Sequence, residues 1–168
     1  MSDLALAMLK QDADIYRSMG RGPIFHEWLL ENGELCGQRV KRKGLTLMTK
    51  KQCFSNSMRT IMQREVDWTE WFYTEGVVAS EDLPILIDHA WLTNRDGEVL
   101  DRTLRKGLNG NDRVHSYYGI PFKPDFAIDA TIKRGFFGLY SDGCMYNRDL
   151  VGKPITVRNG RAWKRRTP

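Results

Sequence analysis

The sequence predicts an α+β domain in which N-terminal helices pack against an antiparallel β-sheet. Apolar residues recur with helical spacing as far as Val66, whereas from Trp71 onward the apolar segments are aromatic, β-branched and extended. Helices that precede strands in this way favour segregation to one side of a sheet. The 168 residues suit one hydrophobic core, so we expect a single domain. We divide it into a helical part (1–48), a core (49–122) and a basic C-terminal part (123–168).

The composition is typical of a folded protein and excludes disordered and membrane classes. Hydrophobic residues make up 41 % of the chain and charged residues 28 %. No apolar run approaches the roughly 18 residues of a membrane span, and the first residues carry charges too early for a signal peptide. We therefore expect a cytoplasmic protein without membrane contact. The three cysteines lack zinc-site spacing, so we expect free thiols and neither a metal nor a cofactor.

Three helices are predicted in the first part of the chain. Ser2 or Asp3 caps a helix that runs to Met19, and Pro23 begins a second, short helix that Gly33 ends. A third helix is expected over Thr49–Val66, with Thr49 as its N-cap. Between them, the basic segment Gln38–Lys43 is a loop or an exposed strand edge.

Extended segments fill the rest of the chain. A turn-forming NRDG sequence joins two of the predicted strands, and an Asn-Gly pair predicts a hairpin near the C-terminus. The expected strands are Trp71–Ala79, Pro84–Thr93, Glu98–Leu104 and Tyr117–Phe122, the loop is Lys106–Asp112, and the hairpin is Ile155–Lys164.

His89 and Asp101 are the polar groups whose placement depends on the register of the predicted hairpin. A two-residue or a four-residue loop puts them on opposite faces. A three-residue loop, Arg95 to Gly97 with Gly97 in the left-handed conformation, pairs Trp91 with Asp101 and makes Asp101 a diagonal neighbour of His89. In that register the carboxylate can hold the imidazole in one tautomer and stabilise its protonated form.

Cys53 is the candidate nucleophile for such a pair. It lies in the first turns of the third predicted helix, where the positive end of the helix dipole and the flanking Lys50 and Lys51 favour a thiolate. The N–H groups of the same turn are donors for an oxyanion.

These residues resemble the transglutaminase-like superfamily of papain-type thiol enzymes. The resemblance rests on the ordered motifs QCF at Gln52–Phe54, HAW at His89–Trp91 and DRT at Asp101–Thr103, about a third of the chain. It implies a transglutaminase-like or papain-like core with Cys53 as nucleophile, His89 as general base and acid, and Asp101 as the orienting carboxylate. The reaction implied is acyl transfer through a thioester. Lys51 departs from the family pattern, which often has Gly there, and so does Leu104, where Pro is frequent.

Other interpretations remain open for each of these residues. Cys53 could be a small buried residue, His89 a core histidine, and Asp101 a turn cap or a partner of a nearby arginine. Asp88 and Asp96 are rival carboxylates, although Asp88 points away from His89 and Asp96 belongs to the turn. Four further residues are candidates for the oxyanion site or the substrate cleft: Gln52, Trp91, Tyr73 and Glu75.

The predicted function is thiol-dependent acyl transfer on an amide or peptide bond, in a protein or peptide substrate, with hydrolysis favoured over transfer to an amine. An alternative comes from the net charge of +5, concentrated in Arg39–Lys51 and Arg158–Arg166. Such clusters can bind nucleic acid or an acidic partner, and Trp163 could stack on a base. A catalytically inactive binding scaffold is a third possibility.

Overall fold

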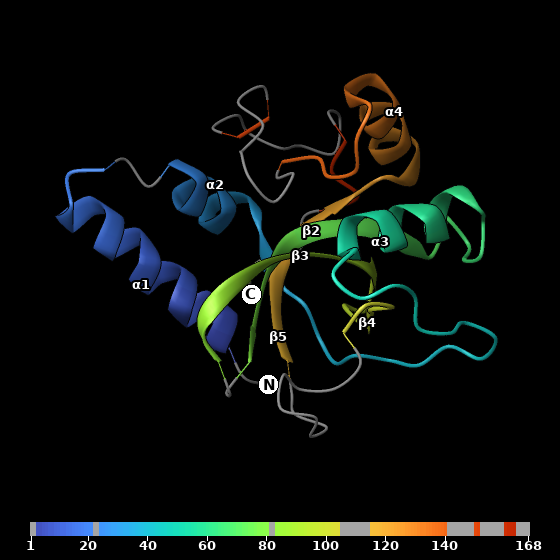
Figure 1. The fold of residues 1–168 in the computed structure, drawn as a ribbon, viewed down its shortest axis with the longest axis horizontal. Coiled ribbons are helices and arrows are strands. Elements are labelled where there is room, and N and C mark those ends of the chain that lie inside the picture. Colours follow the sequence, from blue (N-terminus) through green and yellow to red (C-terminus); the bar gives the residue numbers. More distant parts are fainter. Residues whose placement is uncertain are drawn as a thin grey trace.

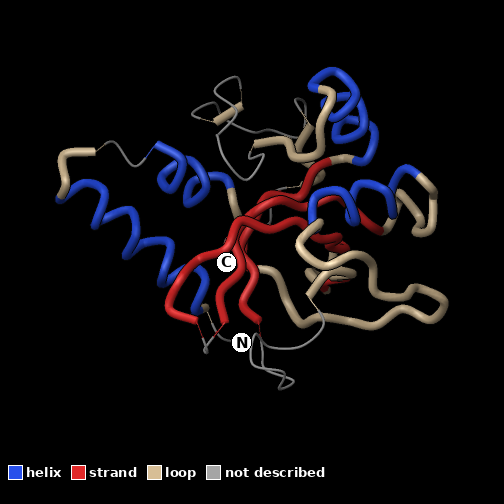
Figure 2. The backbone as a smooth tube through the Cα atoms, in the orientation of Figure 1, coloured by secondary structure: helices blue, strands red, loops and turns tan. Residues whose placement is uncertain are grey.

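A computed structural model describes residues 3–21, 24–80, 83–104, 115–140, 150–151 and 160–163. They form four helices and an antiparallel sheet, which confirms the α+β class (Figures 1 and 2). In chain order the elements are α1 (Leu4–Ser18), α2 (Ile24–Asn32), β1 (Glu34–Leu35), α3 (Cys53–Met62), β2 (Trp71–Ser80), β3 (Leu83–Asn94), β4 (Val99–Leu100), β5 (His115–Phe122) and α4 (Pro124–Arg134).

The sheet has the strand order β1-β5-β2-β3-β4, and all neighbouring strands are antiparallel. β2 lies in the middle and is buried along its whole length. Since side chains alternate along a strand, Tyr73 and Glu75 face one side of the sheet while Thr74 and Gly76 face the other. His89 pairs with Gly76 and therefore shares that second face.

The four helices pack on the first face, which we call the helix face. Side chains from each helix meet alternate residues of β2, β3 and β5 in one buried cluster. Its larger members include Leu9, Trp28, Leu29, Met58, Ile61, Tyr73, Leu92, Tyr118, Ile120 and Phe122. No helix among the described residues is long and apolar enough to cross a membrane.

The second face, which we call the loop face, is covered by the segment between β1 and α3. In Figure 1 this segment runs on the opposite side of the sheet from the helices. Its backbone is bonded to the β4 region: Val40 N donates to Val99 O, and Met48 N donates to Arg102 O. Arg39 also forms a parallel bridge with Val99, so the predicted basic segment lies beside β4. A smaller apolar cluster lies on this face: Cys36, Val78, Trp91, Val99 and Tyr117.

The third helix differs from its prediction at both ends. It begins at Cys53, with Gln52 rather than Thr49 in the N-cap position, and it ends at Met62 rather than Val66. Lys51 and Arg64 have positive φ angles of 61° and 53°, which the helical pattern does not reveal. A left-handed residue on each side interrupts the helix that the apolar spacing predicted.

Three further differences concern the later part of the chain. β4 is shorter than the predicted strand Glu98–Leu104, and neither β1 nor α4 was predicted. Gly160–Trp163, at the end of the predicted hairpin, lies beside β5 through an Arg161–Phe122 bridge. Other predicted features lie outside the described residues: the loop Lys106–Asp112, Cys144 and most of Ile155–Lys164 and Arg158–Arg166.

Candidate active site

The hairpin joining β3 and β4 has the register that the three-residue loop predicts. Leu92 pairs with Leu100 and Thr93 with Val99, while Asn94 N donates to Glu98 O at 3.2 Å. Gly97 has a φ of 84°, the left-handed conformation expected at the end of such a loop. In this register the next pair outward would join Trp91 to Asp101, so His89 and Asp101 share the loop face.

His89 and Asp101 are in direct contact. His89 Nε2 lies 2.8 Å from Asp101 Oδ2, and each residue is only 3 % exposed. The chain bends away from β4 at Asp101, and its other oxygen, Oδ1, accepts hydrogen bonds from the backbone N–H groups of Thr103 (2.8 Å) and Leu104 (3.1 Å). Tyr117 Oη donates to Oδ2 at 2.9 Å. The carboxylate is therefore fixed on both oxygens.

The pair carries opposite charges at neutral pH. Burial alone would lower the pKa of His89, but the attraction of Asp101 and the hydrogen bond to it outweigh burial and raise the pKa to about 9. Burial would raise the pKa of Asp101, but the attraction of His89 and the hydrogen bonds it accepts lower that pKa to about 2. His89 is thus an imidazolium whose Nε2–H is held by a carboxylate.

Cys53 lies where the chain passes from the loop face to the helix face. β4 pairs only with Leu92 and Thr93, so among the described residues β3 has no partner strand on that side before Leu92. The chain rounds this open edge and enters α3, where Ser57 Oγ donates to Ala90 O at 3.0 Å. A residue at the first position of α3 can therefore meet a side chain on the far face of β3.

The Cys53 side chain is a hydrogen-bonding neighbour of the His89 imidazole and contributes to the raised pKa of His89. Since Nε2 is held by Asp101, Nδ1 is the ring nitrogen that remains for the sulfur. Cys36 is also buried on the loop face, but its Sγ lies 3.7 Å from Thr93 Oγ1. Among the described cysteines, Cys53 is the one that meets His89, and it does so as the first residue of α3.

Two buried side chains connect the elements that carry Cys53 and Asp101. Asn56 Nδ2 donates to Thr49 O at 2.7 Å and to Thr103 Oγ1 at 2.9 Å, which joins α3 to the segment before it and to the segment after β4. Arg102 is bonded to Thr46 O, Thr60 Oγ1 and Glu65. These contacts hold the backbone before Cys53 and the backbone after Asp101 at a fixed separation.

Gln52 and Lys51 precede the thiol. Gln52 is exposed and its side chain forms no capping hydrogen bond. Lys51 is exposed and has a left-handed φ of 61°, a conformation that glycine adopts without a steric penalty. Glycine would therefore fit the backbone at this position of the chain.

The remaining predicted site residues lie in two places. Trp91 is fully buried on the loop face, with its rings stacked 6.0 Å from the His89 ring, so it forms a wall beside His89. Gly119 on β5 leaves space for this indole, because a Cβ there would lie 2.7 Å from the nearest ring carbon. Tyr73 and Glu75 are buried on the helix face, and Tyr73 is an electrostatic neighbour of Cys53. They lie on the opposite face from His89.

Tyr117 and Asn56 belong to the site but were not predicted. Tyr117 lies on β5, which β2 separates from β3 in the sheet. No local pattern reveals its bond to Asp101, because that contact depends on the strand order. Asn56 does not stand out in the sequence, because most of its neighbours in Phe54–Ile61 are also polar.

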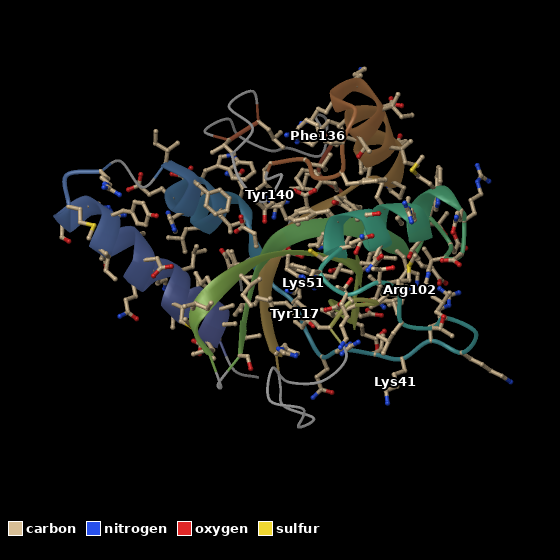
Figure 3. All side chains as sticks on the ribbon, viewed as in Figure 1. Lys41, Lys51, Arg102, Tyr117, Phe136 and Tyr140 are labelled. Carbon is tan, nitrogen blue, oxygen red and sulfur yellow. The ribbon has the colours of Figure 1, made fainter. Side chains whose placement is uncertain are left out.

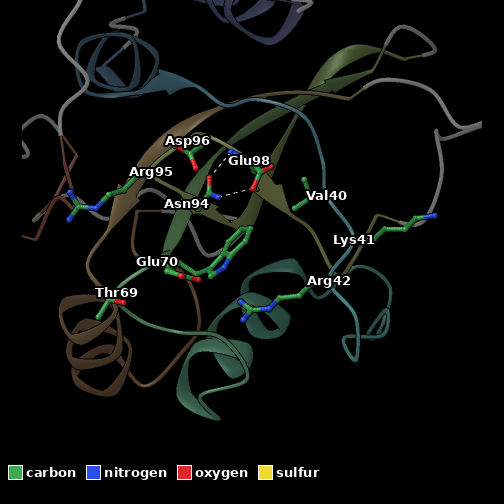
Figure 4. A pocket seen from close by; sticks show the side chains of 10 residues that line it. Val40, Lys41, Arg42, Thr69, Glu70, Asn94, Arg95, Asp96 and Glu98 are labelled. Atoms are coloured by element: carbon green, nitrogen blue, oxygen red, sulfur yellow. Dashed lines mark hydrogen bonds between the residues drawn. The ribbon is translucent and has the colours of Figure 1, made fainter.

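A hollow of about 620 Å³ lies at the other end of the β3–β4 hairpin and contains none of the predicted catalytic residues (Figure 4). Its lining includes three cations, Lys41, Arg42 and Arg95, and three carboxylates, Glu70, Asp96 and Glu98. The balanced charges indicate no particular class of ligand, and two hydrogen bonds between Asn94 and Glu98 (both 2.8 Å) serve the turn itself.

Within the described ranges, no group of three or more His, Cys, Asp or Glu side chains is arranged to hold a metal ion. Comparison with protein-family models, with curated proteins and with solved structures found no match to the chain.

Proposed function

We propose that the protein is a thiol-dependent acyl-transfer enzyme that acts on an amide or peptide bond through Cys53, His89 and Asp101. The observation that supports this proposal is the arrangement around one imidazole: His89 binds Asp101 through Nε2 and is a hydrogen-bonding neighbour of Cys53. A nucleophile, a base in contact with it and a third group that orients the base are the parts required for nucleophilic catalysis.

In the proposed reaction the Cys53 sulfur, as a thiolate, attacks the substrate carbonyl carbon and forms a C–S bond. The resulting tetrahedral intermediate collapses when the C–N bond breaks, and the imidazolium of His89 gives its proton to the departing amine. This leaves a thioester on Cys53 and a neutral imidazole. His89 then takes a proton from water, which attacks the thioester, releases the carboxylic acid and restores the thiolate and imidazolium.

The start of α3 supplies donors for the charge that develops on the carbonyl oxygen. The first helical hydrogen bond runs from Asn56 N to Gln52 O, so the N–H groups of Cys53, Phe54 and Ser55 have no partner within the helix. They point from the positive end of the helix dipole. The exposed Gln52 amide is the additional donor that we assign to this role.

The same arrangement is the reason to propose a transglutaminase-like core. A thiol that opens a helix, a histidine on a strand and a carboxylate just after the next strand follow in that order. Lys51 has the left-handed backbone that the family's glycine would favour. Hydrolysis is favoured over transfer because water needs no second binding site.

The proposal is tested by comparing two cysteines of equal exposure. Cys36 and Cys53 are each 8 % exposed, so a difference in their alkylation by iodoacetamide at pH 7 reports on chemistry rather than access. Site-resolved mass spectrometry should show Cys53 reacting at least about a hundredfold faster, and p-nitrophenyl acetate should leave an acetyl group on Cys53. The initial burst of p-nitrophenol that accompanies this acetylation should survive in Cys36→Ala and disappear in Cys53→Ala.

Equal alkylation of the two thiols without acetylation of Cys53 would refute the enzyme and leave an inactive binding scaffold as the better interpretation. An unchanged burst in Cys53→Ala would refute Cys53 as the nucleophile. The nucleic-acid alternative gains no support from the described part of the C-terminal basic cluster. Arg161 is buried 3.7 Å from Glu34, and the Trp163 ring packs 4.7 Å from Phe72. Arg161 is therefore not presented to a ligand, and one side of the half-buried Trp163 ring is occupied by Phe72.

A further inference from the structure

Tyr117 is a buried tyrosine whose hydroxyl contacts the proposed catalytic carboxylate. It is 1 % exposed, and its hydroxyl donates to Asp101 Oδ2, the oxygen that also binds His89 Nε2. Burial and the nearby Asp101 carboxylate raise the pKa of Tyr117 well above its ordinary value, so the phenol keeps its proton and remains a donor.

The position of this hydroxyl is fixed by the surrounding rings and strands. Tyr117 pairs with Val78 on β2, its ring packs edge-on against Trp91 at 5.1 Å, and its carbonyl accepts from Cys36 N at 2.9 Å. Figure 3 shows Tyr117 and Tyr140 on opposite sides of the sheet. The phenol therefore cannot turn toward another acceptor without disrupting the loop-face cluster.

Sharing one oxygen between two donors has an electrostatic consequence. A hydrogen bond from a neutral hydroxyl withdraws charge from Oδ2, so the carboxylate attracts the imidazolium less strongly than it otherwise would. The other charged or titratable neighbours of this cluster are Arg39, whose Nη2 donates to Asp101 O at 2.7 Å, His115, whose ring lies 6.2 Å from the Tyr117 ring, and the thiols of Cys36 and Cys53. None of these groups donates to Oδ2.

We infer that Tyr117 is a positioning residue of the proposed reaction: it fixes Asp101 Oδ2 and limits how tightly that oxygen holds the proton-bearing imidazole. This inference rests on the proposed function, in which His89 must release a proton to the leaving amine and later accept one from water. A more basic carboxylate would retain the imidazolium and slow the release of the amine.

The test measures the titration of the His89 imidazole by NMR in protein labelled at histidine. Tyr117→Phe should raise the pKa of His89 by about half a unit or more, because Oδ2 loses its competing donor. A ring-fluorinated tyrosine at position 117, whose hydroxyl is a stronger donor, should lower the same pKa. Shifts of opposite sign are not expected from a residue that only fills space.

Two controls remove hydroxyls elsewhere. Tyr118→Phe removes a donor to Leu30 O and Gly33 O on the helix face, and Tyr73→Phe removes the donor to Glu75; both should leave the His89 titration unchanged. An unchanged His89 pKa in both position-117 variants, or equal shifts in the controls, would overturn the inference. Because the titration needs no catalysis, failure of Cys53 to react would refute the proposed function separately.

Discussion

Two buried carboxylates on opposite faces of the sheet have nearly the same neutral donors and opposite charge behaviour. Asp101 accepts from one tyrosine hydroxyl and two backbone N–H groups. Glu75 also accepts from one tyrosine hydroxyl, that of Tyr73 at 2.6 Å, and from two backbone N–H groups, those of Leu139 and Tyr140. Yet burial raises the pKa of Glu75 to about 7, whereas the pKa of Asp101 falls to about 2.

The difference is the cation. Asp101 is in contact with the His89 imidazolium. Arg134 favours the charged form of Glu75 only from a distance, because its guanidinium donates to Gly138 O and Leu139 O instead. Three neutral donors thus leave the pKa of a buried carboxylate raised, whereas one bonded cation in addition lowers it below its ordinary value. The surroundings of Asp101 stabilise its negative charge, whereas Glu75 holds residues 139 and 140 in place by accepting their backbone hydrogen bonds.

The largest expected effect is on the reactivity of Cys53, which should depend on Asp101 and not on Glu75. In Asp101→Asn the main interaction that opposes burial is lost, so the pKa of His89 falls and the imidazole holds its proton less tightly. The rate constant of Cys53 with iodoacetamide should fall about a hundredfold or more. The matched variant Glu75→Gln should change it by less than about threefold. Equal losses would mean that the two carboxylates do not differ in function.

The second prediction concerns the free energy of unfolding as a function of pH. Because the folded-state pKa of Glu75 is raised from 4.5 to about 7, the folded state binds this proton more tightly, and stability falls as pH rises through that window. The loss should amount to as much as about 3 kcal/mol and be absent in Glu75→Gln. Urea unfolding between pH 4.5 and 8 measures it.

His89 adds its own loss of stability between pH 6.5 and about 9, since its folded-state pKa is also raised. That loss is common to wild type and Glu75→Gln, so the difference between the two curves isolates Glu75. Asp101 has the opposite sign: its contribution is lost only as pH falls from about 4 toward 2. Parallel curves for the two proteins above pH 4.5 would contradict the assignment for Glu75.

A smaller effect is expected when Tyr73 loses its hydroxyl. Tyr73→Phe removes the donor to Glu75 Oε1 and should raise the pKa of Glu75 further. The free energy of unfolding at pH 8 should fall by about 1 to 2 kcal/mol, and by less at pH 5, where Glu75 is protonated in both proteins. A loss that is the same at both pH values would show that the hydroxyl does not act through the charge of Glu75.

The smallest effect concerns backbone segments with positive φ angles. One segment precedes Leu139, which binds Glu75, and the other precedes Cys53, which contacts His89. Glycines occupy the positive-φ positions before Leu139, at Gly135 and Gly138, whereas the approach to Cys53 places Lys51 in that conformation. Lys51→Gly should stabilise the protein by about 0.5 kcal/mol, measured by urea unfolding. Cys53 alkylation should change little, because the thiol keeps its place on α3. Destabilisation would show that the lysine side chain contributes more than its backbone costs.

The hairpin itself was predictable because it depends on local chemistry, but its register was not. The sequence NRDG is compatible with loops of two, three or four residues, and only the three-residue loop that the structure has places His89 and Asp101 on one face. The beginning of α3 was not predictable to the residue, because the left-handed turn at Lys51 leaves no mark in a sequence where glycine is absent. α4 could have been predicted: Pro124 and Asp125 open it, Lys133 and Arg134 close it, and Gly135 follows.

Contacts between distant segments account for what the sequence did not reveal. Tyr117 reaches Asp101 because β5 lies next to β2, and the order of strands in a sheet is not encoded in any short pattern. In the sequence, Glu75 is a polar residue within a strand rich in aromatic residues. Its role in holding residues 139 and 140 depends on their folding back over β2. Both contacts depend on the tertiary arrangement of the chain and not on any local sequence pattern.

The passage of Cys53 around the open edge of β3 bears on the order in which the chain folds. His89 and Asp101 are only 12 residues apart and meet within one hairpin, a contact that closes a short loop. Cys53 meets them only after α3 has docked, which closes a longer loop. We expect a refolding chain to acquire its imidazolium–carboxylate pair first and its reactive thiol last, so that a partly folded molecule carries an ordinary cysteine and is chemically harmless.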